Sequence, residues 1–150
     1  MRAVIQRVKN ASVSTDGATV GAIGPGLLVL LGVEPADTAG DVEWLAQKIA
    51  ILRLFEDETG AMNRSVVEAS GDVLVVSQFT LFASTKKGTK PSWHRAAKPD
   101  FAEPMCAQFT AAISALLPRP AQTGRFGAMM DVSLVNDGPV TLIVDTKTRE

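Results

Sequence analysis

Two hydroxyls and a side-chain amide lie together in the segment Ser77–Thr80, near the end of an apolar run. The run from Asp72 to Phe82 predicts a buried strand that becomes polar toward its end. Side chains of this kind can bind or polarise a substrate, and backbone amides at a strand end can stabilise an oxyanion. Because no base is recognisable near either hydroxyl in the sequence, an ordinary polar strand end remains an open interpretation.

The chain has one cysteine and one histidine, Cys106 and His94, which could form a nucleophile and its base. Cys106 falls inside a predicted helix, one position from its apolar stripe, where a buried thiol behaves as a small hydrophobe. We therefore favour a structural role for this cysteine. A single Cys and a single His cannot build a Cys₄, Cys₂His₂ or His₃ zinc site within one chain, nor an internal disulfide. We expect neither a metal nor an organic cofactor.

The segment Lys86–Lys98, called the basic loop below, concentrates positive charge. It holds five of the 15 Lys and Arg residues, no acidic residue, the only His and one of the two Trp. The net charge of the whole chain is only −1, so no global field attracts nucleic acid. A local cationic loop with an aromatic side chain suits phosphate contacts and base stacking, and Lys86, Lys87 and Lys90 are its candidate contacts. Composition alone leaves a solvated charged loop equally open.

Turn signals and periodicity predict the elements that carry these groups. Asp16-Gly17 predicts a hairpin, and Leu27–Val33 reads as a continuous buried strand. Apolar residues at helical spacing predict a helix over residues 41–52, with Thr38 as its N-cap. The first third of the chain is therefore expected to be mainly β.

A second helix is expected to begin at Asp100, with Glu103 completing a capping pattern. Its expected apolar face comprises Phe101, Met105, Phe109, Ile113 and Leu116. Two short strands, 132–135 and 140–144, are expected to be joined by a tight turn at Asn136–Pro139. These elements predict one α+β domain over residues 1–150, in which antiparallel sheets form a β-barrel-like unit with two helices packed outside.

No targeting or membrane segment is visible in the sequence. The opening residues Met1–Lys9 mix apolar and charged residues and lack a signal-peptide core. The longest apolar stretch, Gly26–Val33, is far shorter than the ~20 residues that a spanning helix needs. We therefore expect a cytoplasmic protein without membrane contacts.

Several segments together resemble one family. Ser77–Leu81 and Asn136–Thr141 are similar to the two signature motifs of the D-aminoacyl-tRNA deacylases, also known as the D-tyrosyl-tRNA deacylase family. The opening Met1–Val8 and the loop segment Lys87–Ser92 resemble this family as well. The resemblance covers essentially the whole chain, in the order and at the length usual for the family.

The resemblance implies a homodimeric hydrolase that cleaves the ester between a D-amino acid and tRNA, and also removes glycine mischarged onto alanine tRNA. It implies that Ser77 and Gln78 bind substrate and that the catalytic contribution comes from Phe79 and Thr80. It further implies a cis bond between Gly138 and Pro139, with this pair entering the partner subunit's pocket and rejecting L-aminoacyl groups.

The resemblance also accounts for the missing base. It implies that the 2′-hydroxyl of the terminal adenosine assists the chemistry, while the protein supplies backbone amides around Phe79 and Thr80. A nucleophilic role for Thr80 is the weaker reading, since nothing is identifiable to activate it. Two alternatives stay open at this point: a non-catalytic RNA-binding module that uses the basic loop, and a hydrolase that uses Cys106 and His94.

Overall fold

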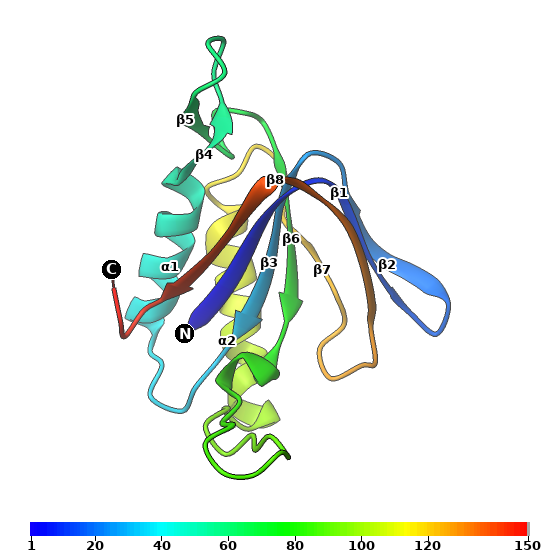
Figure 1. Cartoon of the computed structure of the whole chain (residues 1–150), viewed down its shortest axis with the longest axis vertical. Helices are drawn as coiled ribbons and strands as arrows, with labels where there is room; N and C mark the ends of the chain where they lie inside the picture. The colour runs from blue at the N-terminus through cyan, green and yellow to red at the C-terminus, as the bar shows by residue number, and fades with distance from the viewer. Residues whose placement is uncertain (150) are drawn as a thin grey trace.

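Strand β1 (Arg2–Thr15) organises the sheet of the computed structural model, which describes residues 1–149 (Figure 1). Its first half pairs with β3 (Gly26–Gly32) and its second half with β2 (Ala18–Ile23), both antiparallel. Along its other side, β1 pairs almost throughout with β8 (Asp131–Asp145). The second half of β1 carries β2 and part of β8 away from the helices, which gives the sheet its curled shape (Figure 1).

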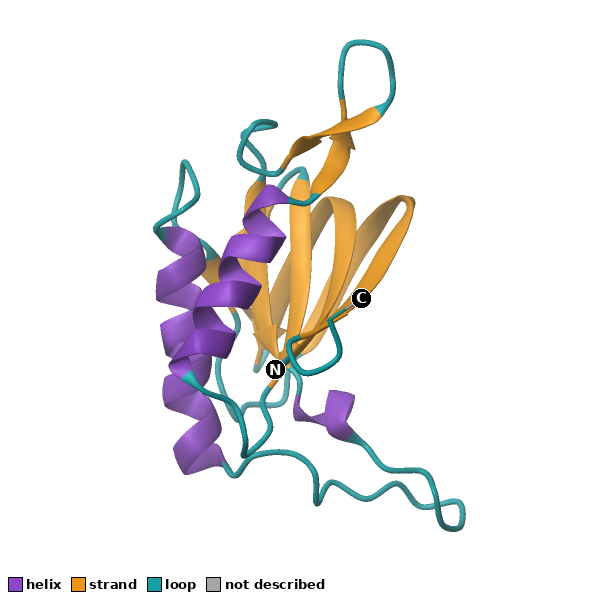
Figure 2. Cartoon of the chain, turned by 90° about the vertical axis from the view of Figure 1, so that its left-hand side faces the viewer, coloured by secondary structure: helices purple, strands orange, loops and turns teal. Residues whose placement is uncertain are grey.

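The remaining elements complete one six-stranded sheet, a small hairpin and the helices. They are α1 (Ala39–Ile51), β4 (Arg53–Glu56), β5 (Met62–Ser65), β6 (Asp72–Ser77), the 3₁₀ helix η1 (Phe79–Phe82), α2 (Pro99–Ser114) and β7 (Gln122–Thr123). Both long helices cover the same face of the sheet (Figure 2). No helix within the described residues is long and apolar enough to span a membrane.

The predicted α+β, barrel-like fold with two packed helices is confirmed, but the sheet is mixed. Strand β6 runs parallel to β3, and β7 runs parallel to β6. Parallel neighbours need a crossover, and the chain makes both crossovers through a helix, α1 in the first and α2 in the second. Both connections pass over the same face of the sheet, so both helices lie on that face (Figure 2).

Two apolar clusters stabilise the fold. One lies between the helices and the sheet and includes Leu45, Ile49, Phe109 and Ile113. The other fills the inside of the curled half of the sheet, where Val8, Ala11 and Val13 meet residues of β3 and β6. Alternate residues of β1 face these clusters, as the period of a strand requires.

Helix α1 begins as the sequence predicts. The Thr38 hydroxyl accepts the Asp41 amide, and the Asp41 carboxylate accepts the Thr38 amide at 2.9 Å, which completes a capping box. Lys147 also donates to Asp41 at 2.7 Å. Burial alone would raise the pKa of Asp41, but the hydrogen bonds from Lys147 and Thr38 outweigh it and hold that pKa well below its usual range.

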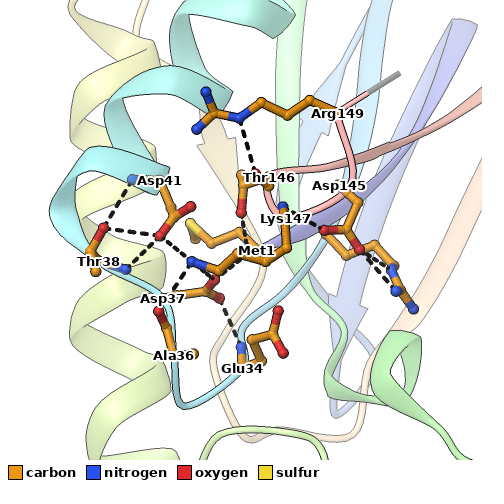
Figure 3. Close-up of polar contacts among 11 residues, drawn as sticks. Met1, Glu34, Ala36, Asp37, Thr38, Asp41, Asp145, Thr146, Lys147 and Arg149 are labelled. Carbon is orange, nitrogen blue, oxygen red and sulfur yellow. Dashed lines mark hydrogen bonds and ion pairs between the residues drawn. The ribbon is translucent and has the colours of Figure 1, made fainter.

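The same network joins both ends of the described chain (Figure 3). The Met1 ammonium group is buried and donates to the Asp37 carboxylate and, at 2.7 Å, to the Thr146 hydroxyl. Asp37 lies in the loop between β3 and α1, and Thr146 follows β8 directly. These contacts fix the lower end of the sheet, from which η1 extends (Figure 1).

Helix α2 differs from its predicted form. It begins at Pro99 after Lys98, whose side chain makes no capping bond, so the predicted cap by Asp100 and Glu103 is wrong. The buried residues are Ala102, Met105, Phe109 and Ile113, whereas Phe101 and Leu116 are exposed. Proline in the first turn lacks an amide that would need a cap, and Ala102 rather than Phe101 continues the stripe at a spacing of three or four residues.

The two predicted C-terminal strands are one strand. Both halves of β8 pair with β1, and the predicted tight turn at Asn136–Pro139 is instead an irregular stretch in its middle. The ladder shifts register on either side of Val8, opposite this stretch. Since β1 is long enough to pair with both halves, the chain continues forward at Pro139 rather than folding back.

Candidate active site

The Ser77–Thr80 segment spans the end of β6 and the start of η1. The strand ends at Ser77, earlier than the predicted Phe82, and Phe79 opens the 3₁₀ helix. The first amides of a helix have no acceptor inside it, so those of Phe79 and Thr80 are available to a ligand. This geometry corrects the predicted end of the strand, and the role of the two amides as donors to a substrate stays a prediction.

The side chains of this segment are ordered by a local hydrogen bond. The Gln78 side-chain amide donates to the Thr80 hydroxyl oxygen. The Thr80 hydroxyl therefore accepts from Gln78 and keeps its own proton to donate. Its partner is an amide rather than a base, so this contact does not activate Thr80 as a nucleophile.

A cavity of about 370 Å³ lies beside the segment. Ser77, Gln78 and Phe79 form part of its wall, together with Trp93 and Cys106. Most of the remaining lining is apolar: Leu31, Val33, Ala96, Ala97, Pro99, Ala102 and Phe126. Its volume falls within the range of small-molecule sites, and Thr80 lies outside its wall.

Cys106 and His94 do not form a catalytic pair. Burial, with a smaller contribution from the nearby Glu103 carboxylate, raises the pKa of the Cys106 thiol to about 11. The thiol is therefore protonated near neutral pH and is a poor nucleophile. The His94 Nδ1 atom lies 3.0 Å from the hydroxyl of Ser92, inside the basic loop. The structural interpretation of Cys106 agrees with this geometry.

The basic loop is closed at its base. Ser84 and Ser92 exchange backbone hydrogen bonds of 2.9 and 3.0 Å, and Gly88 near the tip has a φ of +65°. The hollow within the loop, about 470 Å³, is lined by Ser84, Lys86, Lys87, Lys90, Ser92 and His94. The rings of Trp93 and Phe79 pack edge to face at 5.5 Å, which places the loop beside the Ser77–Thr80 segment.

Gly138 and Pro139 lie away from this site within one chain. Their peptide bond is cis, as the resemblance implies, and both residues are exposed. Pro139 lies in the stretch between the Gln6–Thr141 and Val8–Asn136 pairs of β1 and β8, whereas Ser77 pairs with Leu31, which pairs with Ala3, so about 13 Å along the strands separates the two positions. Three strand spacings across the sheet add about 14 Å. Figure 1 shows the middle of β8 and η1 at opposite ends of the sheet.

The buried Arg7 anchors the middle of β8 through Asp137. The sequence motifs assigned no role to this arginine. Its Nε donates to the Asp137 carbonyl at 3.1 Å and lies 3.3 Å from the Asp137 carboxylate. Its Nη1 donates to the Leu54 carbonyl at 2.6 Å. The alternation of residues along β1 could have indicated this role, because Ala3, Ile5 and Arg7 lie on the same inward face. A buried arginine on that face needs hydrogen-bond partners.

Replacing Arg7 with methionine should destabilise the fold by about 2–4 kcal/mol, because the carbonyls of Asp137 and Leu54 lose their donor. Urea denaturation measures this change. The control is Arg119→Met, which removes a more exposed ion pair with Asp72 and should cost under about 1 kcal/mol. Equal losses in the two variants would contradict an anchoring role for Arg7.

Known proteins resemble this chain over its full length. The chain is 65% identical to the D-aminoacyl-tRNA deacylase of Opitutus terrae and 57% identical to that of Parabacteroides distasonis, each over the full length of both chains. The solved structure of a c-Myc DNA Unwinding Element Binding Protein matches with a TM-score of 0.91 and 41% identity, covering 97% of this chain and 98% of that one.

A more distant structure, that of a probable eukaryotic D-amino acid tRNA deacylase, is 15% identical with a TM-score of 0.81 and supports the fold alone. It covers 95% of this chain and 97% of that one. The family model for D-Tyr-tRNA(Tyr) deacylase matches residues 4–145, a range that contains both signature motifs and the anchoring Arg7. With full-length relatives and a matching fold beside it, the chain belongs to the D-Tyr-tRNA(Tyr) deacylase family.

Proposed function

We propose that this chain hydrolyses the ester bond of D-aminoacyl-tRNA and releases the free amino acid and tRNA. Family membership and full-length relatives named D-aminoacyl-tRNA deacylase support the activity. The observation that carries the site is the position of the Phe79 and Thr80 amides at the start of η1, beside the 370 Å³ cavity. Since this substrate belongs to translation, we place the reaction in the cytoplasm.

The proposed chemistry is the addition of water to the ester carbonyl carbon. The two amides stabilise the negative charge that develops on the carbonyl oxygen. The carbon–oxygen ester bond then breaks, and the ribose oxygen takes a proton. The 2′-hydroxyl of the terminal adenosine assists this proton transfer, so the protein acts mainly by positioning the ester and supplying donors. This division of labour fits a segment in which the Thr80 hydroxyl has an amide as its partner.

We propose that Gly138 and Pro139 select chirality by exclusion. Discrimination of D from L by about 1,000-fold requires about 4 kcal/mol, and one methylene contact supplies only about 1–3 kcal/mol. A backbone wedge that clashes with the L side chain provides a larger difference than such contacts. Because glycine has no side chain to clash, the same wedge admits glycine mischarged on alanine tRNA.

We propose a homodimer in which the wedge of each subunit, formed by Gly138 and Pro139, completes the pocket of the partner subunit. The pocket is the cavity of about 370 Å³ together with the adjoining Ser77–Thr80 segment. Within one chain the wedge and the Ser77–Thr80 segment lie at opposite ends of the sheet, so one subunit does not bring them together. A two-fold axis can bring the wedge of each subunit to the pocket of the other and form two equivalent sites. The exposure of Gly138 and Pro139 is consistent with this role.

Replacing Lys86, Lys87 and Lys90 with alanine should weaken tRNA binding and reduce its salt dependence. Each lysine that no longer binds a phosphate of a single-stranded end lowers the slope of log K against log salt by about 0.7, so the triple variant should lower it by about 2. Filter binding at several salt concentrations measures the slope. The control is Lys9→Ala, because Lys9 is exposed on β1 and lies outside the basic loop. An unchanged slope in the triple variant would contradict this binding site.

A deacylation assay with matched D- and L-aminoacyl-tRNA tests the proposed activity. We expect rapid release of the D-amino acid and negligible release of the L-amino acid. A non-catalytic RNA-binding module would bind both RNAs with no turnover of either, and that result would refute the proposal. Retained activity in Cys106→Ala would exclude the cysteine hydrolase as well.

A further inference from the structure

Two large aromatic side chains stand partly in solvent beside the cavity. Phe79 is 54% exposed and Trp93 is 42% exposed. Their ring centroids are 5.5 Å apart and their planes meet at 77°. An edge-to-face pair leaves at least one face of each ring unstacked. Exposed apolar surface next to a polar rim is typical of a binding site rather than of ordinary surface.

The aromatic pair of Phe79 and Trp93 lies between the apolar cavity and the basic loop. Phe79 and Trp93 both line the largely apolar cavity of about 370 Å³. On the other side, Trp93 follows Ser92, whose backbone bonds to Ser84 close the basic loop. The hollow in that loop is lined by three lysines and no acidic residue. A ligand that crosses this surface meets an apolar cavity, then aromatic rings, then cations.

We propose that Trp93, supported by Phe79, stacks on the unpaired nucleobase that precedes the esterified adenosine at the 3′ end of tRNA. The inference rests on the proposed function, because it takes the terminal nucleotide to occupy the cavity. Aromatic side chains next to cations are the usual means of holding single-stranded nucleic acid, with bases on the rings and phosphates on the cations. The acid-free loop supplies the charge complementarity for those phosphates.

The alternative is that Trp93 only fastens the loop to η1, through its contact with Phe79. The two roles differ in what they do to the RNA. A stacking residue contributes only when an unpaired base is present. A fastening residue affects every RNA that touches the loop, because it positions the cations for any phosphate.

The first experiment reads Trp93 directly. The other tryptophan, Trp44, lies on α1 with the guanidinium of Arg149 4.2 Å from the centre of its ring. Because the chain has two tryptophans and no tyrosine, Trp44→Phe leaves Trp93 as the source of the tryptophan fluorescence. Uncharged RNA minihelices are titrated into this variant, one with a CCA end and one blunt. We expect the CCA-ended minihelix to quench the Trp93 emission and the blunt one to leave it unchanged. Equal responses to the two RNAs would overturn the proposal.

The second experiment measures steady-state kinetics with D-aminoacyl-tRNA. We expect Trp93→Leu to raise KM by about tenfold, the size of one base–aromatic stack, with kcat within about twofold of the wild type. Trp93→Phe keeps a ring and should restore most of the affinity. If Trp93→Leu instead weakens the blunt minihelix as much as the CCA-ended one, Trp93 only fastens the loop and the proposal is wrong.

The two experiments separate this inference from the proposed function. If no form of the chain hydrolyses D-aminoacyl-tRNA, the proposed function fails on its own assay. Fluorescence with uncharged minihelices still decides whether Trp93 meets the unpaired end, since no ester is involved. Conversely, normal hydrolysis with unchanged KM in Trp93→Leu would leave the deacylase activity standing and would refute stacking.

Discussion

Replacing Pro139 with alanine is expected to open the reaction to L-aminoacyl-tRNA. The D-to-L ratio of kcat/KM should fall from about 10³ to about 10, a change of about 3 kcal/mol, chiefly through faster L-ester hydrolysis. The physical reason is that the proline ring fixes the local backbone and supplies bulk to the wedge. Because Pro139 is exposed, its replacement removes little core packing.

Parallel assays with D- and L-aminoacyl-tRNA measure the ratio. Thr141→Ala is the matched control, since Thr141 is exposed on the same strand and is expected to leave the ratio unchanged. Gly138→Ala is a poorer test, because a Cβ on Gly138 would overlap the backbone nitrogen of Val140 and displace the whole segment. An unaltered ratio in Pro139→Ala would remove Pro139 from the selection of chirality.

Replacing Thr80 with valine should lower kcat for D-aminoacyl-tRNA by about 10²-fold without abolishing hydrolysis. Valine has a similar shape but no hydroxyl, so the substrate loses a donor and the Gln78 amide loses its acceptor. Loss of a single transition-state donor typically costs about 10²–10³ in kcat. The backbone amides at the start of η1 remain in the variant, so residual activity above background is expected.

Single-turnover kinetics of Thr80→Val and Thr80→Ser distinguish a donor from a nucleophile. Serine keeps the hydroxyl and should stay within about tenfold of the wild type, since most of the donor's contribution is retained. A nucleophilic Thr80 would give no activity at all in the valine variant and an acyl-enzyme intermediate in the serine variant. Either observation would contradict the positioning role that the Gln78 contact indicates.

Features that depend on neighbouring residues were predictable from the sequence. The Thr38 cap needs only Asp41 three residues later, and the Asp16-Gly17 turn needs two residues that tolerate positive φ, which the structure shows for both. The Ser77–Leu81 and Asn136–Thr141 motifs were also recognisable, because each is contiguous. Family membership could therefore be predicted before the fold was known.

Features that depend on pairing between distant segments could not be predicted from the sequence. Strand β8 is continuous because β1 runs beside both of its halves, and no local signal records the partner's length. The parallel pairing of β3 with β6 depends in the same way on where the α1 crossover returns the chain. The role of Arg7 required knowing that Leu54 and Asp137 converge on it.

The central claim is that the pocket and the wedge of each site come from different subunits, and mixed dimers test it most directly. Thr80→Val impairs the pocket, and Pro139→Trp places a large side chain on the exposed wedge, which should block the partner's pocket. Each variant alone should have little D-ester hydrolysis. In an equal mixture after subunit exchange, heterodimers carry one intact site each.

Random exchange makes half of the dimers mixed, with one of two sites intact, so the mixture should recover about a quarter of the wild-type D-ester hydrolysis. Each variant mixed with itself is the control and should stay at its own low rate, about a hundredth of the wild-type rate for Thr80→Val. Recovery to about a quarter is the predicted result. An equal mixture that exchanges subunits yet stays as inactive as its components would contradict a site shared between two subunits.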